Sequence, residues 1–154
     1  MNPTPPRTID IYCASRHEME TTTQARLPHV VISIRDPGSP MPMLRSHRLR
    51  RAVLSLAFDD SVPTAEDGSI MMKLDDAQAI WRFVNDHLPY INAVVVHCEQ
   101  GVSRSPAVAA GLLLGLGQSA ADIFDRYKPN LFVLRLMLHA REASATNTCA
   151  PAST

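Results

Sequence analysis

Short β-branched runs alternate along the chain with longer segments whose apolar positions recur at helical spacing. Four of the short runs predict strands, at 9–13, 29–34, 52–58 and 93–96. The last two are apolar on both faces, which is typical of strands buried inside a parallel sheet. The strand pattern therefore favours a sheet with buried, parallel members.

The longer segments predict helices between and after these strands. The clearest spans about 74–88, where Ala77, Ile80, Trp81 and Val84 fall on one face. Asp75, three residues before Gln78, resembles a capping box at its start. Further helices are expected at 17–26, 106–116, 119–127 and 131–141. The alternation predicts an α/β domain with a central, mostly parallel sheet of four to five strands flanked by helices.

The composition fits one folded domain of ordinary size. The chain has 154 residues, of which 45% are apolar and 19% are charged, as in globular rather than disordered proteins. We expect a flexible N-terminus over residues 1–8 and a single folded domain over 9–142. Residues 143–154, rich in Ala, Ser and Thr, are expected to be a disordered tail.

Charge and cysteine content narrow the classes of partner. The formal net charge is zero, which argues against a nucleic-acid-binding surface. The longest apolar stretch, 107–116, is far shorter than a membrane-spanning helix, and the proline-rich start does not resemble a secretory signal. Cys13, Cys98 and Cys149 lack the spacing of a disulfide framework or a zinc site. We expect a cytoplasmic protein with no metal, cofactor, membrane or nucleic-acid partner.

The polar segment between the strand at 93–96 and the helix at 106–116 has the features of an anion site. In parallel sheets ligands bind at the carboxyl ends of strands, and a helix N-terminus adds unpaired N–H groups and a favourable dipole. Gly101 permits the loop to fold back so that its amides converge, and Pro106 suits the first helical turn.

Three side chains make this anion site reactive. Cys98 lies at the mouth of the loop, where the helix dipole and Arg104 favour its nucleophilic thiolate form. Arg104 presents a planar fork that can hold two phosphoryl oxygens at once. The hydroxyl of Ser105 can donate a hydrogen bond to the sulfur. The loop therefore predicts nucleophilic attack on phosphorus by Cys98.

The segment His97-Cys98-x5-Arg104-Ser105 resembles the active-site loop of the cysteine-dependent protein tyrosine phosphatases. The sequence of this loop is similar to that of the dual-specificity branch of the family. The resemblance covers roughly 9–142, which would then be a phosphatase domain. It implies a phosphocysteine intermediate, no metal or cofactor, and a His97 that braces the loop rather than acting as a base. The phosphate-binding residues that it implies are Glu99, Gln100, Gly101, Val102, Ser103 and Arg104.

The resemblance also implies an aspartic acid that protonates the leaving group and then activates water. Asp59 and Asp60 follow the predicted strand at 52–58, where that family carries its general acid. Neighbouring residues on extended backbone point to opposite sides, so one of the two is expected to face the pocket. Asp60 is favoured because it precedes Ser61, as the family's acid usually precedes Ser or Thr. Asp59 stays an alternative, and Asp67 is a third.

The function that follows is hydrolysis of phosphomonoesters, foremost phosphotyrosine and also phosphoserine or phosphothreonine of proteins. The alternatives are a non-protein substrate, namely a lipid, a nucleotide or an RNA 5′ end, and a phosphate-binding module without activity. Glu99, Gln100 and Val102 stand where inositol-lipid phosphatases often carry lysine, which disfavours the lipid. The His-Cys start and Arg-Ser end of the loop disfavour a rhodanese-type sulfurtransferase. The preferred phosphoresidue and the oligomeric state stay open.

Two further features have a structural and a functional interpretation. The basic run over 45–51 is expected to be a solvated loop face, with recruitment of anionic substrates as the alternative. Cys13 is expected to be a small core residue. A protective disulfide with an oxidised Cys98, which some relatives form, is the alternative.

Overall fold

Four parallel strands form one sheet in the computed structural model, which describes residues 7–22, 25–64 and 66–148, with side chains up to Glu142. The strands are β1 (Asp10–Ser15), β2 (His29–Arg35), β3 (Arg50–Ala57) and β4 (Ala93–Cys98), in the order β1-β4-β2-β3. The helices are α1 (Arg16–Thr21), α2 (Leu74–His87), α3 (Arg104–Gly115), α4 (Ala121–Arg126) and α5 (Leu131–Thr148), with a 3₁₀ turn, η1 (Leu88–Tyr90), after α2. The predicted α/β class and parallel sheet are confirmed.

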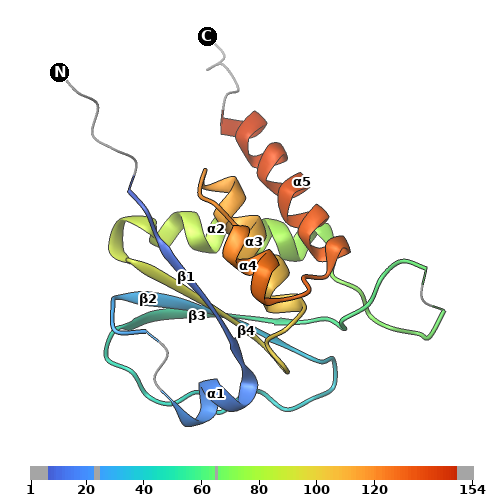
Figure 1. Cartoon of the computed structure of the whole chain (residues 1–154), viewed down its shortest axis with the longest axis horizontal. Helices are drawn as coiled ribbons and strands as arrows, with labels where there is room; N and C mark the ends of the chain where they lie inside the picture. The colour runs from blue at the N-terminus through green and yellow to red at the C-terminus, as the bar shows by residue number, and fades with distance from the viewer. Residues whose placement is uncertain (1–6, 23–24, 65, 149–154) are drawn as a thin grey trace.

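Helices cover both faces of the sheet unequally. Figure 1 shows α2, α3 and α5 on one side and the short α1 on the other. The larger core packs alternate residues of the central strands, including Ile32 and Val94, against Trp81 of α2. A smaller cluster on the α1 side contains Met19 and Val95. Because all six residues of β4 are buried, the strand that leads into the predicted loop is held from both sides.

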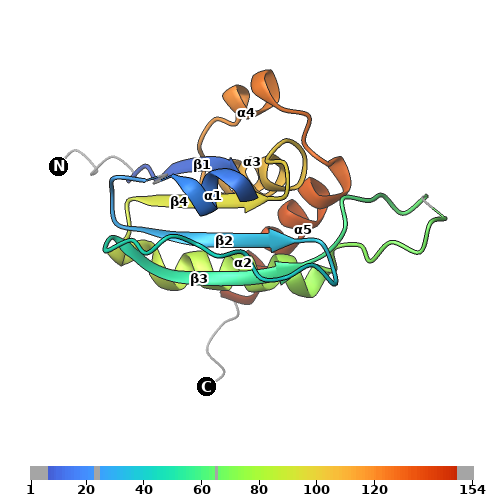
Figure 2. The same cartoon turned by 90° about the horizontal axis from the view of Figure 1, so that it is seen from below.

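The prediction that the run at 52–58 is buried on both faces is wrong. β3 is an edge strand (Figure 2), and its positions alternate between partly buried and exposed. Val53, for example, is 39% exposed. The helices cover one face of the sheet at this edge, so the alternate side chains of β3 meet solvent. An apolar run of this length does not reveal which of its faces will be covered.

The capping residues predicted for α2 are wrong by two positions. The helix begins at Leu74, so Lys73 rather than Asp75 precedes its first turn, and its third residue is Asp76 rather than Gln78. The Asp76 carboxylate accepts a hydrogen bond of 2.9 Å from the backbone N–H of Lys73. A carboxylate at this place satisfies a free amide and complements the helix dipole.

Other helix ends also differ from the sequence-based expectations. α1 ends at Thr21, and α4 begins at Ala121, whose amide donates to Ser119 Oγ at 3.2 Å. α5 continues to Thr148, into the segment 143–154 that was expected to be a tail. Across the described ranges, no helix has both the length and the apolar character needed to cross a membrane.

Candidate active site

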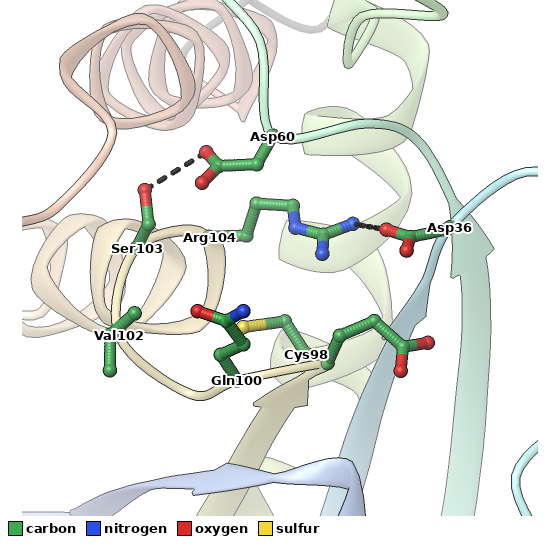
Figure 3. Close-up of a pocket in the computed structure, with 8 residues that line it drawn as sticks. Asp36, Asp60, Cys98, Gln100, Val102, Ser103 and Arg104 are labelled. Carbon is green, nitrogen blue, oxygen red and sulfur yellow. Dashed lines mark hydrogen bonds and ion pairs between the residues drawn. The ribbon is translucent and has the colours of Figure 1, made fainter.

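The carboxyl ends of β2, β3 and β4 meet at one edge of the parallel sheet. Asp36 directly follows β2, Asp60 follows β3, and Cys98 is the last residue of β4. Parallel pairing therefore brings three reactive or charged side chains from distant parts of the sequence together. They border a pocket of about 260 Å³, shown in Figure 3. The residues that line it are Asp36, Asp60, Cys98, Glu99, Gln100, Val102, Ser103 and Arg104.

The Cys98 thiol lies at the floor of this pocket between two hydrogen-bond donors. The side chain is 2% exposed. Its Sγ accepts a hydrogen bond from the Gly101 amide at 3.2 Å and lies 3.2 Å from Ser105 Oγ. Both groups can donate to a negatively charged sulfur, and α3 begins directly after the loop with its N-terminus toward the pocket. This environment suits the thiolate as attacking group and as leaving group.

Gly101 allows the loop to close over the end of β1. Its φ is +75°, and a Cβ at this position would lie 2.8 Å from the backbone of Ala14 and Ser15. Both the left-handed conformation and the close approach require glycine.

Gly101→Ala is expected to lower the free energy of unfolding by about 2–5 kcal/mol, from the left-handed backbone and the clash with β1. Gly117→Ala is the matched control, because Gly117 has a φ of +76° but no heavy atom within 4 Å of the place that a Cβ would take. Urea unfolding of both variants measures the difference. Equal losses would contradict the close packing of the loop on β1.

Arg104 is anchored within the pocket by two acceptors. The residue is 5% exposed, and its Nη1 donates to the Phe58 carbonyl at 2.7 Å and forms an ion pair with Asp36 Oδ1 at 2.7 Å. Figure 3 shows the guanidinium reaching toward Asp36. Asp36 is not among the site residues predicted from the sequence. Its place two residues after the predicted strand at 29–34 was the available signal, but nothing in the sequence paired it with Arg104.

Asp36 is expected to have two opposing effects. Its negative charge weakens the binding of an oxyanion in the pocket, and its carboxylate orients Arg104. Asp36→Asn keeps an oxygen acceptor and removes a negative charge, so inorganic phosphate should inhibit roughly 3–10-fold more tightly, a screened Coulomb effect of about 1 kcal/mol. Asp36→Ala also removes the acceptor and should lower kcat by about 10-fold. Inhibition constants and kcat with para-nitrophenyl phosphate test both, and unchanged phosphate affinity in Asp36→Asn would refute the charge effect.

Asp60 is held at the rim of the pocket by two donors from other segments. Its Oδ1 accepts hydrogen bonds from Ser103 Oγ and Asn130 Nδ2, each at 2.9 Å. Asn130 also donates to the Ser61 carbonyl at 3.0 Å, and its Oδ1 accepts from two amides in the first turn of α5. The N-terminus of α5 thus fixes the position of Asp60. Asn130 has no role in the site as predicted from the sequence.

Asp59 and Asp67 lie outside the pocket lining and have other partners. The Asp59 amide donates to the Ile70 carbonyl at 2.7 Å, and Asp59 Oδ2 accepts from the Ile70 amide at 2.8 Å. These bonds close the base of the loop that extends from the body between β3 and α2 (Figure 1). Within that loop, Ser69 donates to Asp67 and lowers the pKa of its carboxyl, which disfavours Asp67 as an acid.

His97 and Glu99 connect the loop to the α1 side of the sheet. His97 is fully buried, and its Nε2 lies 2.6 Å from Ser33 Oγ on β2. Burial lowers the pKa of His97, so the ring is neutral at neutral pH. Glu99 accepts hydrogen bonds from Arg16, at its carbonyl from the amide (3.1 Å) and at its carboxylate from Nη1 (3.2 Å). The bracing role expected of His97 stays a prediction.

Cys13 has the environment of a core residue. It packs against the main core, and burial raises the pKa of its thiol to about 12, so the thiol is protonated at neutral pH. The disulfide with Cys98 stays a hypothesis, and Cys149 lies outside the described residues. Within the described part of the chain, no three His, Cys, Asp or Glu residues form a group that could hold a metal ion.

Comparison with known proteins gives matches among solved structures. No model of a protein family and no curated protein matches the sequence. Human DUSP28 is 20% identical with a TM-score of 0.59, covering 89% of this chain and 94% of its own. A mouse putative dual specificity phosphatase, complexed with zinc tungstate, is 17% identical with a TM-score of 0.58, covering 99% and 98%. PTPMT1 in complex with PI(5)P is 12% identical with a TM-score of 0.53, covering 91% and 95%.

These matches span nearly the whole of each chain, and they share the α/β architecture described above. The chain therefore has the fold of the cysteine-dependent protein tyrosine phosphatases. One of the matches is described as a putative dual specificity phosphatase. The sequence of the loop that contains Cys98 resembles that branch.

Proposed function

We propose that this chain is a cysteine-dependent phosphatase that hydrolyses phosphomonoesters of proteins, foremost phosphotyrosine, through a phosphocysteine intermediate. The observation that carries the proposal is the environment of the Cys98 sulfur. The Cys98 Sγ accepts from the Gly101 amide, lies beside Ser105 Oγ and shares its pocket with Arg104 and Asp60. A nucleophile, an anion-binding group and an acid thus line one cavity.

In the first step the Cys98 thiolate attacks phosphorus, forming the S–P bond as the P–O bond to the leaving alcohol or phenol breaks. Arg104 and the amides of the loop hold the non-bridging oxygens, whose charge they balance. The leaving oxygen takes its proton from Asp60, which becomes a carboxylate. Asp60 is suited to this step because Ser103 and Asn130 fix one of its oxygens while the carboxyl lines the pocket.

In the second step water attacks the phosphocysteine, and the Asp60 carboxylate takes a proton from that water. The S–P bond breaks, inorganic phosphate leaves, and the thiolate of Cys98 is restored. Ser105 Oγ, 3.2 Å from the sulfur, can donate its proton toward the sulfur as negative charge returns to it. The enzyme ends in its starting protonation state.

The lining of the pocket favours a phosphoprotein over an inositol lipid. Arg104 is the one cation among the eight lining residues, and Asp36, Asp60 and Glu99 are acidic. A highly charged headgroup would meet these carboxylates with few cations to balance them. The structural likeness to PTPMT1, solved with PI(5)P, makes a lipid phosphate the necessary comparison substrate.

The test is turnover by the purified chain. We expect hydrolysis of para-nitrophenyl phosphate and of phosphotyrosyl peptides, inhibition by vanadate, and slower release of phosphate from phosphatidylinositol phosphate vesicles. Absence of turnover with phosphate still bound would favour the phosphate-binding module, and faster vesicle hydrolysis would favour the lipid. Thiosulfate-to-cyanide transfer without phosphate release would indicate a sulfurtransferase.

A further inference from the structure

A second groove opens directly beside the candidate phosphate pocket. It has a volume of about 510 Å³, within the range of ligand-binding clefts. Val102 and Ser103 line both cavities, so the groove lies next to the pocket. The other residues that line the groove are Phe124, Asp125, Arg126, Tyr127 and Lys128.

The walls of this groove are connected by backbone hydrogen bonds. The Lys128 amide donates to the Val102 carbonyl at 3.3 Å, and the Asn130 amide donates to the Ser103 carbonyl at 3.1 Å. The segment after α4 is therefore tied to the same loop that surrounds the Cys98 sulfur. A group bound in the groove is held at a fixed offset from the phosphoryl group, which is what a specificity subsite requires.

The groove is lined both by exposed apolar side chains and by charged side chains. Val102 is 48% exposed and Phe124 is 46% exposed, although both are large apolar side chains. Covering them removes apolar surface from water and is favourable. Asp125, Arg126 and Lys128, which carry charges of both signs, also line the groove.

Resting on the proposed function, we infer that this groove binds an apolar side chain of the phosphoprotein substrate, close in sequence to the phosphorylated residue. Val102 and Phe124 contact the apolar side chain, and the charged lining residues offer donors and an acceptor to the peptide backbone. Phe124 is the specificity-determining residue, because it presents exposed apolar surface and lies outside the loop that holds phosphate.

A peptide suits this groove better than an acyl chain. A lipid tail needs continuous apolar walls, whereas three of the seven lining residues here are charged. A peptide brings amide and carbonyl groups that lose water on binding and need partners, which Asp125, Arg126 and Lys128 provide.

The experiment uses a set of phosphotyrosyl peptides, each varied at a single position. That position is one of the two before or the two after phosphotyrosine, and it carries either Leu or Gly. For wild type, at least one position should give kcat/KM about 5–10-fold higher with Leu than with Gly, as burial of a partly covered side chain predicts. Phe124→Ala should bring that ratio close to one while kcat/KM for para-nitrophenyl phosphate stays within about 2-fold.

The matched control is Tyr90→Ala, which removes another exposed aromatic ring, 70% exposed, from η1 at the opposite ends of the strands. It should leave the Leu preference intact. A wild-type enzyme without any Leu preference, or a preference that survives Phe124→Ala, would overturn the groove assignment while leaving the phosphatase proposal standing. An effect of Phe124→Ala on phosphatidylinositol phosphate vesicles alone would assign the groove to a lipid instead. Failure of wild type on para-nitrophenyl phosphate would count against the phosphatase itself.

Discussion

Replacing Cys98 by serine is expected to reduce turnover of para-nitrophenyl phosphate by roughly 10⁴-fold or more. A serine hydroxyl is a weak nucleophile unless a base removes its proton. The groups that the structure places next to the sulfur, the Gly101 amide and the Ser105 hydroxyl, are suited to donate hydrogen bonds to it and not to remove a proton from a serine. The nearby His97 pairs with Ser33 instead. Initial rates of wild type and variant measure the loss.

The same variant separates chemistry from binding. Serine keeps the size and hydrogen-bond capacity of the side chain, so Arg104 and the loop amides should still bind the oxyanion. We expect phosphate to raise the midpoint of thermal unfolding of the Cys98→Ser protein, as ligand binding to the folded state requires. Acid quenching during turnover should leave a phosphoryl adduct on wild type and none on the variant. Comparable rates for the two proteins would refute the nucleophile.

The reactive loop could be predicted because its parts are local. A buried strand, a short polar segment with Gly101 and a helix starting beside Arg104 follow one another within a few residues. Peptide geometry alone then places the sulfur, the amides and the guanidinium near one another, and the structure has this arrangement. Alternation along extended backbone likewise predicted that one of Asp59 and Asp60 would face the pocket, as the lining shows.

The partners of these residues could not be predicted because they come from other elements. Asp36 contacts Arg104 because β2 is adjacent to β4 in the sheet. No single segment of the sequence determines the order of the strands. Asn130 reaches Asp60 because α5 packs with its N-terminus beside the end of β3. The solvent-exposed face of β3 follows from the same kind of fact, its place at the edge of the sheet.

Asp60→Asn is expected to slow hydrolysis in proportion to the basicity of the leaving group. Asparagine keeps an oxygen that can accept from Ser103 and Asn130 but has no carboxyl proton to donate. Phenyl phosphate, whose leaving group needs a proton, should lose about 10²–10³-fold in kcat, within the usual range for general acid catalysis. Dinitrophenyl phosphate, whose leaving group departs as an anion, should lose far less. A series of substituted phenyl phosphates gives the slope that measures the proton transfer.

Asp59 supplies the control that decides which carboxylate is the acid. Asp59→Asn retains an acceptor for the Ile70 amide, so the base of the loop should stay closed and rates should stay near wild type. Asp59→Ala removes that acceptor and should let Asp60 shift, with a loss of about 10-fold that grows with leaving-group basicity. If Asp59→Asn instead reproduces the steep dependence while Asp60→Asn does not, the proton comes from Asp59. The position of Asp60 at the pocket would then reflect only its bonds to Ser103 and Asn130.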